Sequence, residues 1–283
     1  MLHCAGNAHK YPVAEIIPRF ELLARDYDVI LCDVWGVVHD GVTLYPGAEE
    51  RLEGWRQQGR CVILITNAPR TAEAVERQLG RIGLSHSSYD FVATSGEAGI
   101  EALNALGRPV GFVGTAADLE ILEGRGVKIA DNDDFTELAC TGVTESRPDP
   151  KAYLGDLERW AERDVHMHCL NPDRVVIRGG VPEACAGAIA DLYQGLGGRV
   201  TWYGKPHAAI YGHALHRAGD PPKDEVLAIG DGLQTDILGA ARMGFDAVFV
   251  SGGIHAGEPF PEDFAMLNGL DDWKPVGIVE GLA

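Results

Sequence analysis

The chain has 283 residues, of which 46% are hydrophobic and 23% are charged, so it can form one large α/β domain or two smaller ones with ordinary cores. Its 42 acidic residues against 24 basic ones give a formal net charge of -18, and no run rich in lysine or arginine occurs. This excess of negative charge argues against a nucleic-acid or anionic-membrane partner. Binding of an anionic substrate would therefore require a metal ion, a few placed cations and backbone N–H groups.

Neither cysteine pairing nor a membrane segment is indicated. The six cysteines are scattered without a CxxC pair, so we expect buried, reduced packing residues. No stretch approaches the ~20 apolar residues of a membrane span, and residues 1–20 lack a basic segment followed by an apolar one. These features favour a soluble cytoplasmic protein.

Short apolar runs alternate with amphipathic stretches along most of the chain, which is typical of a mainly parallel sheet covered by helices. The first strand, Val29–Asp33, is apolar and ends on a carboxylate. A helix that begins at Thr71 keeps apolar residues on one face and ends at Gly83. The predicted core strands are 29–33, 61–66, 91–94, 200–203, 226–231 and 247–250.

The middle of the chain has the pattern of a second α/β unit, although no linker rich in glycine, serine or proline marks its limits. Its predicted strands are 110–113, 139–143 and 167–170, and its predicted helices are 98–106, 117–122 and 151–163. His166 and His168 alternate on a strand and so share a face, as two ligands of a metal ion would. Because the sequence offers no third ligand nearby, a structural role is favoured for both.

Four short segments that follow apolar runs collect the reactive groups. They are Asp33-Val-Trp-Gly36, Thr66-Asn67, Gly204-Lys-Pro206 and Gly230-Asp-Gly-Leu-Gln-Thr-Asp236. An open parallel sheet builds its site at the carboxyl ends of its strands. We therefore expect these segments to meet at one edge of the sheet.

The chemistry of this set favours phosphoryl transfer. Asp33 and Asp231, with Asp236 one helical turn beyond, form an oxygen-rich cluster suited to Mg²⁺, which also neutralises like charges. Thr66, a following N–H group and Lys205 are donors for the phosphoryl oxygens. With phosphate held in place, Asp33 can attack phosphorus and form an aspartyl-phosphate that water later hydrolyses.

The four segments, in this order, resemble the motifs of the haloacid dehalogenase (HAD) superfamily. The long insert before Lys205 resembles the α/β cap of subfamily IIA, which includes NagD-type nucleotide phosphatases and p-nitrophenyl phosphatases. The resemblance implies a Rossmann-like parallel-sheet core with an inserted α/β cap of the C2 type. It places the core in residues 1–94 and 182–283 and the cap in residues 95–181.

The resemblance also implies roles for individual residues. Asp33 corresponds to the nucleophile and, with Asp231 and the backbone carbonyl of Trp35, to the Mg²⁺ ligands. Asp236 corresponds to a metal ligand that binds the ion directly or through a water molecule. Thr66 and Lys205 correspond to catalytic groups that position the phosphate.

Substrate contacts are expected from both parts of the chain. The backbone of Asn67 is a further phosphate donor by the same resemblance, and Lys205 binds substrate as well as acting in catalysis. Arg147 and Asn171 lie in predicted cap loops and are candidates for substrate binding. A homodimer formed through the cap is compatible with the family.

Trp35 departs from the family pattern. In related phosphatases the side chain two residues after the nucleophile is normally an aspartate that protonates the leaving oxygen, and an indole cannot do this. Three interpretations follow: a substrate with a good leaving group, a substitute acid such as His39 or Asp40, or different chemistry. Haloacid dehalogenases have an aromatic residue here because halide leaves unprotonated, but they lack the IIA-type cap.

We therefore predict a Mg²⁺-dependent phosphatase that hydrolyses a small phosphorylated metabolite through an aspartyl-phosphate. The first alternative is a dehalogenase-like hydrolase that cleaves a carbon–halogen bond. The second is a catalytically weakened protein that binds a phosphorylated ligand. The sequence does not identify the substrate.

Overall fold

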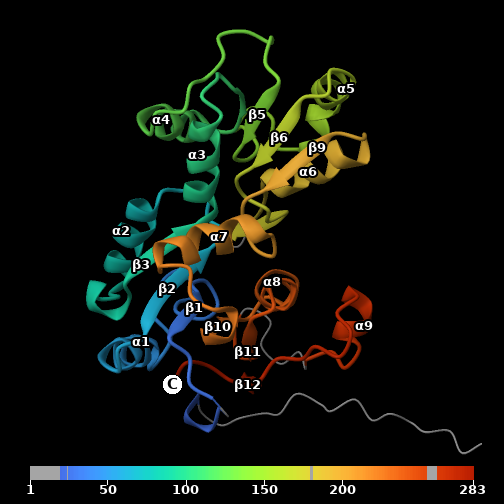
Figure 1. The fold of residues 1–283 in the computed structure, drawn as a ribbon. Helices are drawn as coiled ribbons and strands as arrows, with labels where there is room; N and C mark the ends of the chain where they lie inside the picture. Colours follow the sequence, from blue (N-terminus) through green and yellow to red (C-terminus); the bar gives the residue numbers. More distant parts are fainter. Residues whose placement is uncertain (1–19, 24, 179–180, 254–259) are drawn as a thin grey trace, which may run out of the picture.

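The computed structural model describes residues 20–23, 25–178, 181–253 and 260–283. Within them the chain forms two α/β units, one built on a six-stranded sheet and one on a four-stranded sheet above it (Figure 1). We call the first unit the core and the second the cap. This arrangement confirms the predicted fold class, a parallel-sheet core with an inserted α/β cap.

The core sheet consists of parallel strands in the order β12-β11-β10-β1-β2-β3. Their bounds are β1 (Val29–Asp33), β2 (Cys61–Thr66), β3 (Phe91–Thr94), β10 (Val226–Gly230), β11 (Asp246–Val250) and β12 (Gly277–Val279). The chain first builds outward from β1 through β2 and β3, and later in the other direction through β10. The strand order therefore reverses between β1 and β10, and ligands of open parallel sheets bind at the carboxyl ends beside such a reversal.

Helices cover both faces of the core sheet, as its apolar strands require, since every residue of β1 is buried. One face packs against α1 (Ala48–Gln57) and α2 (Ala72–Ile82), the other against α7 (Ala208–Arg217), α8 (Leu238–Met243) and α9 (Phe264–Asn268). The shorter turns of this unit are η1 (Phe20–Leu22), η2 (His86–Ser88), η4 (Lys223–Glu225) and the π-helical η5 (Leu233–Ile237).

Helix α2 begins and ends where its terminal residues predict. The Thr71 hydroxyl accepts a hydrogen bond from the Ala74 N–H group at 3.3 Å, which satisfies a donor of the first turn. Gly83 ends the helix with a φ of 110°, a left-handed conformation that glycine adopts without strain. Val75 and Leu79 lie buried on the face that packs on the sheet.

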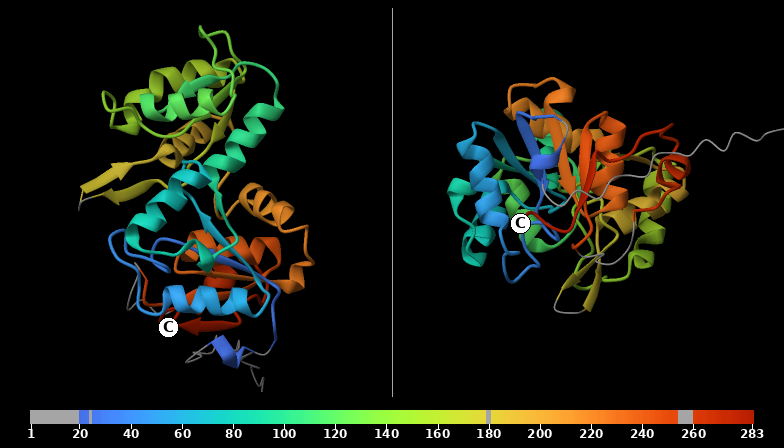
Figure 2. Two further views of the ribbon diagram at one scale, coloured as in Figure 1. Left: turned by 90° about the vertical axis from the view of Figure 1, so that its left-hand side faces the viewer. Right: turned by 90° about the horizontal axis from the view of Figure 1, so that it is seen from below.

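The cap sheet is also parallel, in the order β4-β5-β6-β9. Its strands are β4 (Gly111–Val113), β5 (Glu137–Cys140), β6 (His166–Cys169) and β9 (Arg199–Trp202). Helices α3 (Ser95–Ala105) and α4 (Ala116–Gly124) form one apolar layer, and η3 (Pro150–Tyr153), α5 (Leu154–Glu162) and α6 (Ala186–Gly195) form another. An antiparallel hairpin, β7 (Val175–Arg178) with β8 (Val181–Ala184), extends from the side of the cap (Figure 2).

One predicted core strand lies in the other sheet. The expectation that 200–203 belongs to the core sheet is wrong, because β9 pairs with β6 in the cap. Short apolar strands of either sheet have the same local sequence pattern, so the pattern does not report which sheet a strand joins. The domain limits 1–94, 95–181 and 182–283 stay a prediction, and limits that follow the sheets would place the second boundary after β9.

The remaining general expectations concern cysteines and membranes. Cys32, Cys140, Cys169 and Cys185 are buried, Cys61 is partly buried, and none of these five forms a disulfide. Cys4 lies outside the described residues. No helix in the described part of the chain is long and apolar enough to cross a membrane. The cytoplasmic location stays a prediction.

Candidate active site

Polar side chains gather where the central strands of the core sheet end, on the side that leads into the cap. Asp33 is the last residue of β1, Thr66 is the last residue of β2, and Asp231 directly follows β10. Lys205 comes three residues after β9 and so enters from the cap. Two of the strands, β1 and β10, flank the reversal in strand order, as the motifs predict.

Lys205 lies buried between two of the predicted site carboxylates. Its Nζ donates hydrogen bonds to Asp33 Oδ1 at 2.5 Å and to Asp236 Oδ1 at 2.7 Å. It also lies 3.4 Å from the carbonyl oxygen of Ile65 at the end of β2. These charge-assisted bonds hold the Asp33 carboxylate in one orientation.

The side chain of Asn67 joins Lys205 to the core, and the core to the cap, through hydrogen bonds. Its Oδ1 accepts the Lys205 N–H group at 2.7 Å, and its Nδ2 donates to the Lys205 carbonyl oxygen at 3.2 Å. The same Nδ2 donates to Asp173 Oδ1 of the cap at 2.8 Å. The side chain of Asn67 therefore has a structural role beside the phosphate contact predicted for its backbone, and that contact stays a prediction.

Asp173 is a site residue that none of the four sequence motifs contains. It lies four residues after β6, and the preceding Asn171 accepts its N–H group through Oδ1 at 3.1 Å. The detectable signal is the turn sequence Asn171-Pro172-Asp173 after an apolar strand. What the sequence could not show is the Asn67 partner, which is 106 residues away along the chain.

Three acidic side chains converge at this edge of the sheet. One carboxylate oxygen from each of Asp33, Asp231 and Asp236 lies within 4.8 Å of the others, and all three residues are buried. Asp236 comes from the π-helical turn η5, where it also accepts hydrogen bonds from the Gly232 N–H group and the Thr235 hydroxyl. The structure thus brings together the predicted carboxylate ligands.

Negative charge is in excess here, because three carboxylates converge at this point and the ammonium group of Lys205 pairs with two of them, Asp33 and Asp236. Burial, followed by the charge of Asp236, raises the pKa of Asp33 well above its usual range. Burial alone would lower the pKa of Lys205, but the Asp236 and Asp33 carboxylates more than offset this and raise it. Lys205 is therefore charged, and a further cation would keep Asp33 ionised as a nucleophile.

The donor set fits Mg²⁺, whose ligands in proteins are oxygens that include one or two carboxylates. Two glycines leave room beside Asp231: a Cβ atom at Gly36 or Gly253 would lie 2.1 or 2.3 Å from its Oδ2. Only glycine can approach this carboxylate so closely. The assignment of Asp33, Asp231, Asp236 and the Trp35 carbonyl as ligands stays a prediction that this geometry supports.

Trp35 lies at the surface beside the cluster. The residue is 43% exposed, and its ring meets the His39 ring edge to face at a centroid distance of 5.7 Å. It also covers Gly41, where a Cβ atom would lie 2.7 Å from the indole. The indole therefore forms an apolar wall on the loop that follows the nucleophile.

His39 and Asp40, the two substitute acids that the sequence suggests, are both in a protonation state that does not favour proton donation. His39 Nδ1 accepts the Gly41 N–H group at 2.8 Å, and burial lowers the pKa of this imidazole, so the neutral form is favoured. Asp40 accepts N–H groups from Val42 and Thr43, which lower its pKa and keep it ionised near neutral pH. A neutral imidazole and an ionised carboxylate are both poor acids.

Three other predicted residues have local partners. Thr66 Oγ1 accepts the Ala68 N–H group at 3.3 Å, at the turn beside Asn67. Asn171 is buried in the turn that carries Asp173. Arg147 is held within the cap by Asp156 Oδ2 at 2.7 Å. Substrate binding by Arg147 and Asn171 and catalysis by Thr66 stay predictions.

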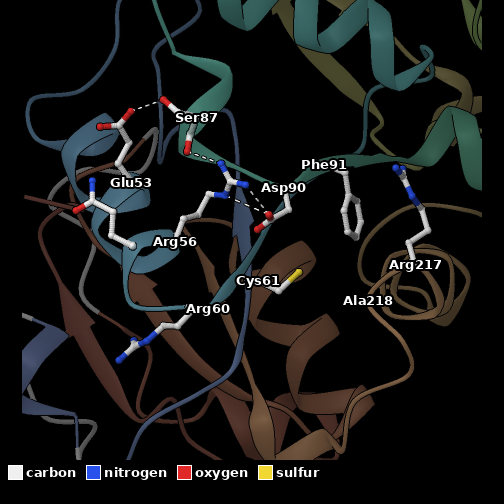
Figure 3. A pocket seen from close by; sticks show the side chains of 11 residues that line it. Glu53, Arg56, Arg60, Cys61, Ser87, Asp90, Phe91, Arg217 and Ala218 are labelled. Carbon is white, nitrogen blue, oxygen red and sulfur yellow. Dashed lines mark hydrogen bonds and ion pairs between the residues drawn. The ribbon is translucent and has the colours of Figure 1, made fainter.

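A large open hollow of about 720 Å³ lies elsewhere on the core (Figure 3). It is lined by Cys61 and Phe91, the first residues of β2 and β3, and by Arg56, which is bound to Asp90 and to the Ser87 carbonyl. Asp33 and Thr66 lie at the opposite ends of their strands. This hollow is therefore separate from the candidate active site.

Two family models match parts of the chain. The model for haloacid dehalogenase-like hydrolases matches residues 30–128, which include β1 and β2. A second model, described as HAD-hydrolase-like, matches residues 202–273, which include Lys205 and Asp231. The four motif segments that carry Asp33, Thr66, Lys205 and Asp231 lie within these two ranges, whereas Asp173 lies between them.

Individual proteins are similar over most of the chain. It is 30% identical over 234 residues to the ribonucleotide monophosphatase NagD of Escherichia coli K12, which covers 80% of this chain and 88% of that protein. The crystal structure of a haloacid dehalogenase-like hydrolase from Brucella suis 1330 has a TM-score of 0.79 and 34% identity, and covers 95% of this chain and 100% of that one.

A second similar crystal structure contains a metal ion. Glycerol phosphate phosphatase from Mycobacterium tuberculosis, crystallised in complex with magnesium, has a TM-score of 0.70 and 23% identity, and covers 90% of this chain and 76% of that one. At this identity the likeness concerns the fold alone.

Proposed function

Because this chain belongs to the haloacid dehalogenase-like hydrolase family, in the group of NagD and the p-nitrophenyl phosphatases, we propose that it is a Mg²⁺-dependent phosphatase of small phosphorylated metabolites. The observation that carries the proposal is the buried cluster of Asp33, Asp231 and Asp236 at the reversal in strand order. Lys205 binds two of these carboxylates, those of Asp33 and Asp236. The related nucleotide phosphatase supports the reaction class, and the three converging carboxylates support the ion.

Asp33 acts as the nucleophile in the first step. One of its carboxylate oxygens forms a bond to phosphorus while the bond between phosphorus and the ester oxygen breaks. The Lys205 ammonium, the Thr66 hydroxyl and the Asn67 backbone N–H donate to the phosphoryl oxygens, where charge is concentrated in the transition state. Asn67 also keeps Lys205 in place through its side chain.

In the second step water attacks phosphorus, inorganic phosphate leaves and Asp33 is regenerated. Asp33, Asp231, Asp236 and the Trp35 carbonyl would hold Mg²⁺. When bound, this ion supplies positive charge that offsets the carboxylates and the phosphate.

The leaving oxygen departs without a carboxylic acid beside it. Trp35 carries no acidic proton, His39 is neutral and Asp40 is ionised. We therefore expect the enzyme to favour phosphate esters whose leaving group is stable as an anion, such as an aryl oxide.

The first test is phosphate release from p-nitrophenyl phosphate in the presence of Mg²⁺. Asp33→Asn should abolish turnover, and EDTA should do the same to the wild type until Mg²⁺ is restored. Asp26→Asn is the matched control, because Asp26 is 96% exposed and pairs only at the surface with Arg60. Full activity of Asp33→Asn would refute the nucleophile.

The intermediate can be measured directly. Acid quenching during turnover, followed by mass spectrometry, should find one phosphoryl group on the peptide that contains Asp33. The two alternatives predict other results. Halide release from a haloacid that EDTA does not affect would favour the dehalogenase, and binding of phosphate without any turnover would favour a binding protein.

A further inference from the structure

A second group of metal-ligating side chains lies in the cap. Glu137 is the first residue of β5, and His166 and His168 lie on the neighbouring strand β6. One ligand atom from each lies within 4.8 Å of the other two. Among the described residues, this group and the carboxylate cluster of the candidate active site are the ones with such geometry.

Both imidazoles point at the same carboxylate oxygen. His168 Nε2 lies 2.8 Å from Glu137 Oε2, and His166 Nδ1 lies 3.4 Å from that oxygen. Zinc binds histidine nitrogens and carboxylate oxygens at about 2.0–2.2 Å in a tetrahedral arrangement, which places neighbouring ligand atoms about 3.3 Å apart. The two separations from Glu137 Oε2 lie on either side of this value, and the two nitrogens lie within 4.8 Å of each other, so small side-chain shifts would bring the three atoms to coordination geometry.

The remaining polar atoms of the cluster already have partners of the required kind. In each imidazole, the nitrogen that faces away from Glu137 (the outer nitrogen) lies at hydrogen-bond distance from a hydroxyl group. His166 Nε2 lies 2.8 Å from Thr201 Oγ1 in β9, and His168 Nδ1 lies 2.7 Å from the hydroxyl of Tyr203, the residue after β9. Glu137 Oε1 accepts a hydrogen bond from Arg108.

Such outer partners select the tautomer and orient the ligand. If the outer nitrogens donate their N–H groups to these hydroxyls, the lone pairs of both inner nitrogens face the Glu137 carboxylate. Lone pairs and a carboxylate repel one another, so a cation bound between the two inner nitrogens and Glu137 would make this arrangement favourable.

The ligand types indicate which ion would bind, and the surface shows how it would enter. Two imidazoles and one carboxylate suit Zn²⁺ and similar transition-metal ions, whereas Mg²⁺ and Ca²⁺ prefer oxygen ligands only. Glu137 and His168 are buried, but the side chain of His166 is 24% exposed. Solvent therefore reaches the cluster from one side, where water can complete the coordination.

We propose that Glu137, His166 and His168 form a transition-metal site in the cap that takes Zn²⁺ and joins β5 to β6. The site is distinct from the carboxylate cluster that serves the proposed phosphatase reaction, because its ligands lie at the start or in the middle of cap strands. Its ion stabilises the cap sheet by cross-linking neighbouring strands.

The test uses Co²⁺ as a spectroscopic substitute for Zn²⁺. The full-length protein is stripped of metal, kept in a large excess of Mg²⁺ and titrated with Co²⁺ while visible absorption is recorded. We expect one equivalent of Co²⁺ to bind and to give the intense absorption bands of a low-coordinate site. Added Zn²⁺ should then displace the Co²⁺ and remove these bands. His168→Gln should weaken binding at least ~100-fold, whereas His216→Gln is the matched control because His216 is 78% exposed and distant in sequence from the cluster.

Two further variants locate the ion and guard against misfolding. Asp231→Asn should retain the Co²⁺ bands, because this carboxylate belongs to the other cluster. Tyr203→Phe removes only the hydroxyl that orients His168 and should weaken binding by about 10- to 100-fold. Circular dichroism establishes that each variant is folded.

Several results would overturn the proposal. They are the absence of Co²⁺ binding in the wild type, unchanged binding in folded His168→Gln or Tyr203→Phe, loss of the bands in Asp231→Asn, and a thiolate-to-cobalt charge-transfer band, which would place the ion on cysteine. A rise in the unfolding temperature of the wild type with Zn²⁺, absent from His168→Gln, would support it.

Discussion

Replacing Trp35 by aspartate should restore protonation of the leaving group and change which substrates the enzyme prefers. General acid catalysis contributes typically about 10² to 10⁴ in rate, which corresponds to about 3–5 kcal/mol of barrier. The gain should appear with alkyl phosphates, whose leaving oxygen needs a proton. It should be small with p-nitrophenyl phosphate, whose leaving group is stable as an anion.

The same substitution also has a cost in stability. Trp35 is 43% exposed, so roughly half of the side chain is buried against its neighbours. Losing roughly 100 Å² of apolar burial lowers the free energy of unfolding by about 2–3 kcal/mol. Trp35→Asn is the matched control, because it has the same size and the same packing loss as Trp35→Asp but supplies no carboxylic acid.

The assay compares kcat/KM of the two variants on an alkyl phosphate and on p-nitrophenyl phosphate, with denaturant unfolding measured in parallel. We expect Trp35→Asp to exceed Trp35→Asn by about 10² or more on the alkyl phosphate. Equal activity of the two variants on that substrate, or an equally large gain on p-nitrophenyl phosphate, would show that position 35 does not limit protonation of the leaving group.

Three other substitutions test the site and the fold. Gly36→Ala should raise the Mg²⁺ concentration for half-maximal activity at least ~10-fold, because the new Cβ would lie 2.1 Å from Asp231 Oδ2. Gly54→Ala is the control and should leave this Mg²⁺ concentration unchanged, because no atom lies within 4 Å of its new Cβ. Lys205→Met should lower kcat by about 10²–10³ at saturating Mg²⁺, and a smaller loss than tenfold would contradict its role as a phosphate donor. Thr71→Ala removes the cap of α2 and should lower the free energy of unfolding by about 1 kcal/mol in urea, with activity per folded molecule unchanged.

Much of the core could be predicted from local sequence. The strand Val29–Asp33 and the strand Cys61–Thr66 are confirmed with their predicted bounds, because a short apolar run between turn residues has few other structures available. Helix α2 has a threonine and a glycine at its ends, which are strong local signals. The edge strand β12 and the β7–β8 hairpin were not predicted, and β9 was predicted in the wrong sheet.

The candidate site could be predicted in part. Asp33, Asp231 and Asp236 meet as the motif order indicates, since the carboxyl ends of parallel strands share one edge of the sheet. The Asn67 contacts with Asp173 and Lys205 were not predicted, because they join segments 106 and 138 residues apart. The inability of His39 to act as an acid also depends on burial that no local pattern reports.

The sequence by itself therefore determined the chemistry available to this protein: a carboxylate at the end of a buried strand, later carboxylates and a lysine in a fixed order, and an indole where an acid is usual. These features are local or periodic, so they can be recognised before folding. The tertiary structure decided which groups touch. Glu137 joins His166 and His168 only because β5 and β6 are neighbours in the cap sheet, and hydrogen bonding and metal coordination depend on distances of a few ångströms that chain order does not specify.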